Sequence, residues 1–85
     1  MPVTPELLDE LNTLLRFDLD TNQQGIKIHH DAPAAIAASA QRLHDKGLIT
    51  QIDGGYLTPL GRHAAEHAQT LISILTTSPG LGNTP

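Results

Sequence analysis

RLHDKGLITQIDGGYLTPLG, residues 42–61, contains the signals for a helix end, a β-hairpin and a helix start in direct succession. Gly47 stands where a helix-terminating glycine belongs, because only glycine enters the left-handed backbone region without a steric cost. Leu48 follows at the position whose side chain contacts Leu43 in a Schellman cap. This spacing predicts that a helix ends at Lys46.

The residues after Gly47 predict a hairpin that leads into the last helix. Residues 48–52 are apolar and β-branched enough for a strand, and Asp53-Gly54-Gly55 is a tight-turn signal. Residues 56–58 can return as the partner strand. Thr58 is then an N-cap with Pro59 at the first helical position, so we predict a helix over residues 59–77.

This order of elements resembles the second half of a winged helix-turn-helix domain, through the phrases KGLI and YLTPLGR. The resemblance implies that the helix ending at Lys46 is the recognition helix and that the hairpin is the wing. The whole chain, which opens TPELLDELNTLLRFDL, also resembles a small family of bacterial proteins of about 80 residues whose role is uncharacterised.

The N-terminal residues predict an amphipathic helix that ends near Arg16 or Phe17. Thr4 is its N-cap, and Pro5 fits its first position. A stripe of leucines at helical spacing forms the predicted buried side: Leu7, Leu8, Leu11, Leu14 and Leu15. The opposite side holds Glu6, Asp9, Glu10, Thr13 and Arg16, and we expect it to be an ordinary solvated face.

The middle of the chain predicts a short strand and the second helix. Residues 26–29 alternate as a half-buried strand that can join the hairpin in a three-stranded sheet. Pro33 suits the first turn of a helix, so Ala32 is the expected N-cap, with Asp31 as the alternative. Ile36, Ala40 and Leu43 are expected on its buried side.

These elements predict a small α+β, winged-helix-like domain in the order α-β-α-β-β-α. It departs from the winged-helix pattern because the usual second helix is replaced by the strand at residues 26–29. A single domain is expected over residues 1–77, since an 85-residue chain fits one core. Residues 78–85 are rich in proline and glycine and are predicted to be a disordered tail.

Composition limits the possible classes of protein. Aromatic residues make up only 2% of the chain, so the core must consist mainly of leucine and isoleucine. The absence of cysteine excludes disulfides and thiol chemistry. No apolar run is long enough for a membrane span, and no secretory signal is present, so a cytoplasmic location is expected. The net charge of −4 opposes strong non-specific attraction to nucleic acid.

Two functions are compatible with these patterns. The winged-helix resemblance implies a DNA-binding or transcription-accessory module. Its duplex-DNA contacts would be Lys27, Gln41, Arg42, Lys46 and Arg62. The acidic balance and the alanine-rich exposed face of the second helix instead suggest a protein-interaction module with no nucleic-acid role.

The last helix also predicts self-association. Its apolar arc spans roughly 180°, which is wider than the ~100° that one core contact requires. We therefore expect one edge of the helix to pack on its own domain and the other on a second copy. The alternative is a core helix that is fully buried in a monomer. The predicted homodimer contacts are Leu71, Ile72, Ile74 and Leu75.

The last helix contains His63-Ala64-Ala65-Glu66-His67, which matches the H-x-x-E-H string of some zinc proteases. Such an enzyme also needs a third metal ligand and a substrate cleft, and those proteases are far larger. His67 lies inside the apolar arc, so a core or interface histidine is the favoured interpretation. We predict no enzyme activity, no catalytic residue, no cofactor and no metal site.

Overall fold

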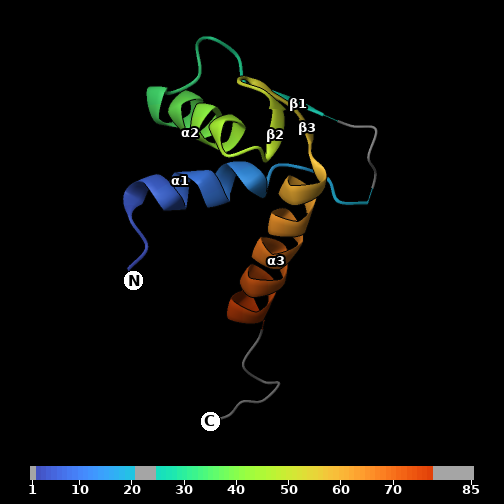
Figure 1. Cartoon of the computed structure of the whole chain (residues 1–85). Helices are drawn as coiled ribbons and strands as arrows, with labels where there is room; N and C mark the ends of the chain where they lie inside the picture. The colour runs from blue at the N-terminus through green and yellow to red at the C-terminus, as the bar shows by residue number, and fades with distance from the viewer. Residues whose placement is uncertain (1, 21–24, 78–85) are drawn as a thin grey trace.

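The computed structural model describes residues 2–20 and 25–77 of the chain. Three helices and a three-stranded antiparallel sheet alternate in the predicted order, α-β-α-β-β-α (Figure 1). The elements are α1 (Pro5–Leu14), β1 (Ile26–Lys27), α2 (Ala34–Asp45), β2 (Ile49–Gln51), β3 (Gly54–Leu57) and α3 (Pro59–Thr76). The predicted disordered tail at 78–85 lies outside the described residues.

The helix boundaries follow the predicted caps at three of the sites. The Thr4 hydroxyl accepts a hydrogen bond from Leu7 N at 3.1 Å, and the Thr58 hydroxyl accepts one from Gly61 N at 3.0 Å. Each threonine is followed by proline, whose missing N–H costs nothing in the first turn. At the end of α2, Leu48 N donates to Leu43 O at 2.9 Å with Gly47 at φ +82°, which is the predicted Schellman cap.

The start of α2 corrects a prediction. Neither Ala32 nor Asp31 is the N-cap, because Pro33 takes that position and the helix begins at Ala34. The ψ of Pro33 is 142°, which is extended, and its side chain cannot accept a hydrogen bond. Its carbonyl still receives the N–H of Ile36 at 3.0 Å.

The hairpin turn lies earlier in the chain than predicted. Ile52 and Asp53 form the turn, and Gly54 and Gly55 already belong to β3. Pairing shifts register between the two strands, so β3 carries one extra residue, and Gly55 has a φ of +74°. A bulge at a left-handed glycine explains why this strand, and not the turn, contains the glycine pair.

The strand predicted at residues 26–29 is shorter than expected. Only Ile26 and Lys27 form β1, which pairs with β3, so the sheet order is β1-β3-β2. Ile28 continues the contact by donating its N–H to Asp53 O at 2.7 Å. The strand is therefore present in the predicted sheet, but it ends before His29.

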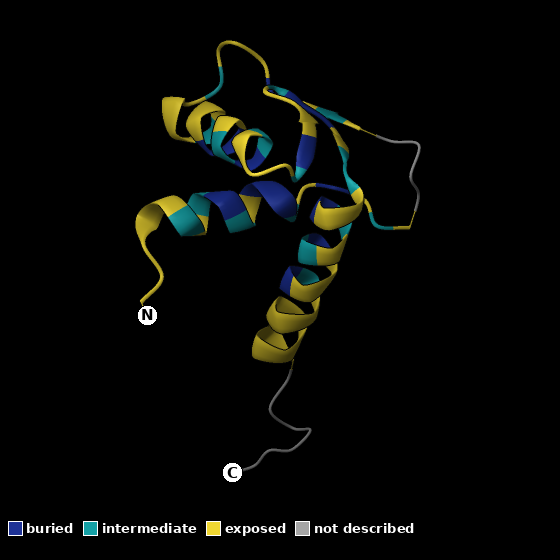
Figure 2. Ribbon diagram, in the orientation of Figure 1, coloured by how far each residue is buried: buried dark blue, intermediate teal, exposed yellow. Residues whose placement is uncertain are grey.

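The core is small and lies where α1, α2, the sheet and the first half of α3 meet. Figure 2 shows the buried residues concentrated at this junction, whereas the second half of α3 is exposed. The buried apolar cluster consists of Leu14, Phe17, Ile28, Ala40, Leu43, Ile49 and Ala65. Gly61 lets the start of α3 approach Leu48, the residue before β2, since a methyl group there would overlap the Leu48 carbonyl oxygen.

Candidate functional site

The interface between α1 and α2 contains a buried carboxylate. Glu10 of α1 is only 6% exposed, and its side chain meets two cations, one in α2 and one at the α2 C-cap. Arg42 Nε donates to Glu10 Oε2 at 2.9 Å, and Lys46 Nζ donates to Glu10 Oε1. Arg42 also donates to the Glu6 carbonyl oxygen at 3.2 Å. Glu10 therefore holds both cations of α2 against α1.

The pKa of Glu10 reports the same arrangement. Burial raises the pKa of this carboxyl, but the hydrogen bonds from Lys46 and Arg42 and the two positive charges together outweigh it. The result is a pKa below its ordinary value, so the group stays ionised at neutral pH.

A second polar contact joins the same two helices. Thr13 and Ser39 are both fully buried, and their hydroxyl oxygens lie 2.7 Å apart. Ser39 donates its own proton to Ile36 O at 2.7 Å, so Thr13 is the donor to Ser39. Each buried hydroxyl thus has a partner, which avoids the cost of an unsatisfied polar group.

These contacts correct the predicted orientation of α1. Glu10 and Thr13 were expected on the solvated side, and both are buried against α2. The leucine stripe lies on a neighbouring side instead. Only Leu14 is buried, while Leu8 is 52% exposed and Leu7, Leu11 and Leu15 are partly buried. Charge pairing with α2, which no periodicity within α1 reveals, decides the orientation.

The five residues predicted to contact nucleic acid are not gathered on one face. Arg42 and Lys46 point to α1, and Arg62 on α3 donates to the Leu19 carbonyl oxygen and pairs with Glu66 at 3.9 Å. Only Lys27 and Gln41 line a common pocket.

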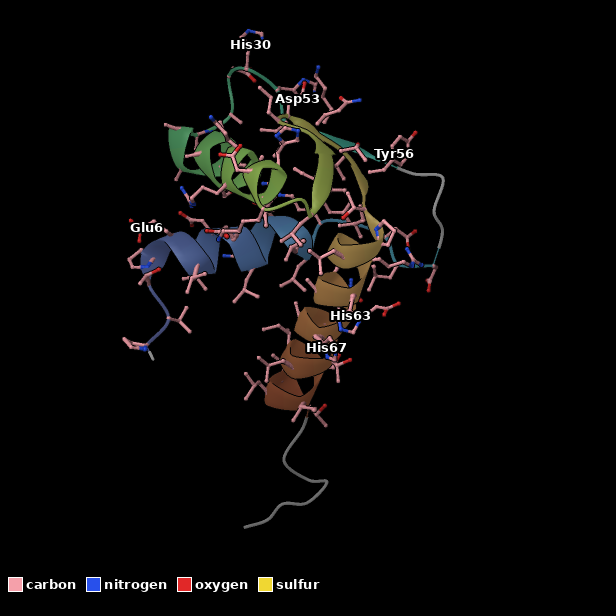
Figure 3. All side chains as sticks on the ribbon, viewed as in Figure 1. Glu6, His30, Asp53, Tyr56, His63 and His67 are labelled. Carbon is pink, nitrogen blue, oxygen red and sulfur yellow. The ribbon has the colours of Figure 1, made fainter. Side chains whose placement is uncertain are left out.

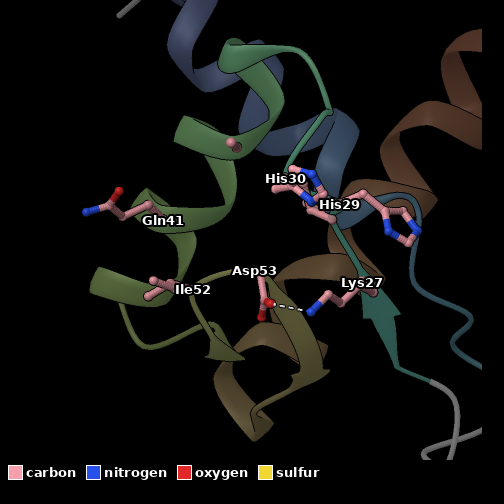
Figure 4. Close-up of a pocket in the computed structure, with 8 residues that line it drawn as sticks. Lys27, His29, His30, Gln41, Ile52 and Asp53 are labelled. Carbon is pink, nitrogen blue, oxygen red and sulfur yellow. Dashed lines mark ion pairs between the residues drawn. The ribbon is translucent and has the colours of Figure 1, made fainter.

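That pocket lies between α2, the end of β1 and the hairpin turn (Figure 4). Its volume is about 310 Å³, at the lower end of the range for small-molecule sites. Its lining combines an apolar part with a polar rim: Lys27, Ile28, His29, His30, Ala37, Gln41, Ile52 and Asp53.

Two charged side chains that line this pocket, Lys27 and Asp53, pair with each other. Lys27 Nζ lies 3.0 Å from Asp53 Oδ2, so the lysine charge is partly balanced. The hydrogen bond from Lys27 lowers the pKa of Asp53, which keeps its carboxylate charged. Within residues 2–20 and 25–77, no three His, Cys, Asp or Glu side chains lie close enough to hold a metal ion. The pocket therefore offers polar and charged side chains beside an apolar wall.

The most unusual surface is on the C-terminal half of α3, which extends past the rest of the domain (Figures 1 and 2). The four residues predicted for the dimer interface are all exposed there: Leu71 at 50%, Ile72 at 37%, Ile74 at 67% and Leu75 at 68%. Ile72 follows Gly61, Ala65 and Ala68 on one side of the helix, at spacings of four, three and four residues. The side that packs on the core therefore continues beyond it as apolar surface.

Two histidines lie on the same helix, on its exposed surface. His63 and His67 are one turn apart, and their ring centres are separated by 4.5 Å with the planes at 82° (Figure 3). Both are exposed, so His67 is not a core residue of its own domain. The predicted alternative, an interface histidine, remains open.

No helix in the described part of the chain is long and apolar enough to cross a membrane. Comparison with curated proteins and with solved structures finds no match for the chain. A family comparison does match, over residues 1–76, which include all six helices and strands. The chain belongs to DUF5669, a family of unknown function.

Proposed function

We propose that this protein is an interaction module that self-associates through α3. The observation that carries the proposal is the exposure of Leu71, Ile72, Ile74 and Leu75 on consecutive turns of one helix. Scattered exposed apolar residues are normal, but a contiguous patch of large ones marks an interaction surface.

The free energy gained by burying these four side chains can be compared with the free energy that a micromolar dimer requires. Each of these half-exposed side chains would contribute about 0.8–1.5 kcal/mol on burial, so two copies give roughly 6–12 kcal/mol. Association itself costs at least about 4 kcal/mol. A dimer with a Kd of about 1 μM has a binding free energy near −8 kcal/mol, so it needs about 12 kcal/mol of gross gain. The α3 residues reach that value only at the top of their range.

The leucines of α1 supply the additional surface. Leu8 is 52% exposed, and Leu7, Leu11 and Leu15 are only partly buried, although α1 already packs on both α2 and α3. We therefore place the interface over the C-terminal half of α3 and the leucine side of α1. A second copy would bury both surfaces in one helical contact, as the isologous interface of a two-fold dimer requires.

Sedimentation velocity from about 1 to 100 μM tests this proposal directly. We expect a concentration-dependent dimer with a Kd near the micromolar range. A protein that remains monomeric at ~100 μM contradicts the proposal.

Binding of duplex DNA is the second candidate, and one observation favours it. Gln41 is exposed on α2 and Lys27 is 66% exposed nearby, so both can reach a ligand beside the hairpin. Arg42 and Lys46 are less available, because a phosphate would have to compete with the Glu10 carboxylate for both cations. A fluorescence titration at low salt tests this candidate, since even non-specific binders reach about 10⁻⁴–10⁻⁶ M.

A further inference from the structure

We infer that His63 and His67 form half of a binding site for a divalent transition-metal ion, which the same two residues of a second copy complete. The inference rests on the proposed self-association of α3. It names a ligand and a pair of residues that the apolar contact alone does not require.

The spacing and exposure of the two histidines suit a chelate. Residues one helical turn apart project from the same side, and both imidazoles are exposed. With Zn–N bonds of about 2.0–2.1 Å, two imidazoles on one tetrahedral ion have ring centres about 5 Å apart. The observed separation of the two ring centres, 4.5 Å, is close to this value.

One chain cannot complete the site. A structural zinc site takes four protein ligands, and the described residues contain no cluster of three or more candidate side chains. Two chains would provide four neutral imidazoles, a ligand set that suits zinc, copper or nickel. The sequence predicts no metal site, and the site inferred here departs from that prediction because two chains share it.

The position of the pair on α3 fits a two-fold interface. Leu60, His63, His67 and Ile74 follow one another at spacings of three, four and seven residues, so they share one side of the helix. Leu60 and Ile74 are 56% and 67% exposed and flank the histidines at either end. This side of α3 is apart from the leucine side of α1, so the shared site needs the two copies of α3 to lie against each other along it. A two-fold axis that passes beside His63 and His67 would then place four imidazoles around one point.

The test compares two double variants that each remove two histidines. His63→Gln with His67→Gln deletes the inferred ligands. His29→Gln with His30→Gln is the matched control, because those side chains are adjacent in the segment after β1 and line the separate pocket. Sedimentation is measured for each protein in EDTA and with zinc. Cobalt is used as a spectroscopic probe, because tetrahedral Co²⁺ absorbs far more strongly in the visible than the hydrated ion.

We expect zinc to lower the dimer Kd at least tenfold in the unmutated protein and in the His29/His30 control, with one ion bound per two chains. The His63/His67 variant should lose this response while its circular dichroism stays unchanged. If that variant fails to fold, the cobalt spectrum and the stoichiometry of the unmutated protein still decide the matter.

The possible failures are distinguishable. A dimer in EDTA that ignores zinc and gives no tetrahedral cobalt spectrum overturns the metal site and leaves the proposed function standing. A monomer under both conditions overturns both. Zinc binding at one ion per chain without dimerisation, or an equal zinc response in the His63/His67 variant, overturns the shared site. A dimer that forms only with zinc and only with both histidines supports the metal site. It contradicts the proposal that the apolar contact alone is sufficient for association.

Discussion

Glu10 on α1 and Arg42 on α2 form a part-buried ion pair in which Arg42 Nε lies 2.9 Å from Glu10 Oε2. The two residues are 32 positions apart in the chain, and Lys46 joins the same carboxylate one turn later. The pair couples the orientation of the first helix to the two cations that a nucleic-acid-binding surface on α2 would need. Stability and candidate function therefore compete for the same side chains.

The first prediction concerns this carboxylate. Glu10→Gln should lower the free energy of unfolding by about 1–3 kcal/mol, because the partly buried cations Arg42 and Lys46 lose their charged acceptor. The measurement is urea denaturation at pH 7. Glu66→Gln is the control, since that carboxylate is exposed and its pair with Arg62 should contribute less than about 1 kcal/mol. Equal effects from the two variants would contradict the assigned role of Glu10.

The second prediction is the pH dependence of the same group. The pKa of Glu10 is lower in the folded protein than its ordinary value of 4.5. Its stabilising contribution is therefore fully present above pH 4.5 and is lost as the pH falls through the lower folded pKa. We expect the unmutated protein to lose more stability than Glu10→Gln between neutral pH and pH 3. If the melting temperatures of the two proteins fall in parallel as the pH decreases, Glu10 is not the group responsible.

The third prediction concerns Gly61, where local and tertiary effects have opposite signs. Alanine has a helix propensity about 1 kcal/mol better than that of glycine, so an isolated helix would be stabilised by the change. In the folded protein the new methyl group would overlap the Leu48 carbonyl. We therefore expect Gly61→Ala to destabilise by about 1–3 kcal/mol through forced backbone shifts. Thr70→Ala, at an exposed position of α3, should be neutral or slightly stabilising, and a stabilised Gly61→Ala would refute the close approach.

The fourth prediction separates association from folding. Ile74→Asp combined with Leu75→Asp should give monomers, because a carboxylate cannot be buried in an apolar interface without a partner. Both positions are exposed, so the free energy of unfolding of the monomer should change by less than about 1 kcal/mol. Ser73→Asp, which adds one carboxylate at an exposed polar position on the same turn, is the control and should remain dimeric. Loss of the dimer in both the double variant and Ser73→Asp would indicate a general charge effect instead of a specific interface.

The fifth prediction addresses the DNA-binding candidate. Lys27→Gln should weaken any binding and reduce its salt dependence, because this exposed lysine is the cation beside the pocket. Arg42→Met should instead lower stability and leave affinity nearly unchanged, because Arg42 is held by Glu10. An equal loss of affinity in both variants would indicate that DNA displaces Arg42 from Glu10.

The sequence by itself determined the elements and their order, because the signals for these are local. Thr4-Pro5 and Thr58-Pro59 each place a cap and a proline next to the helix they begin, and Gly47 ends α2 through bonds that span a few residues. The strand at residues 26–29 was also predictable from alternation, although pairing with β3 stops the ladder at Lys27. The hairpin turn was misplaced because a turn signal and a bulge signal both consist of glycine.

Only the tertiary structure decided which surfaces are buried and which side chains remain available for binding. The leucines of α1 predict one buried side, but Arg42, Lys46 and Ser39 on α2 turn Glu10 and Thr13 inward, and four leucines stay partly or largely exposed. The same packing pairs Arg42 and Lys46, two of the predicted nucleic-acid contacts, with Glu10. The extent of α3 beyond the core likewise depends on where α1 and the sheet end, and this extent leaves Leu71, Ile74 and Leu75 exposed. These outcomes depend on contacts between residues far apart in the chain. Their side chains come within contact distance only once the helices have packed.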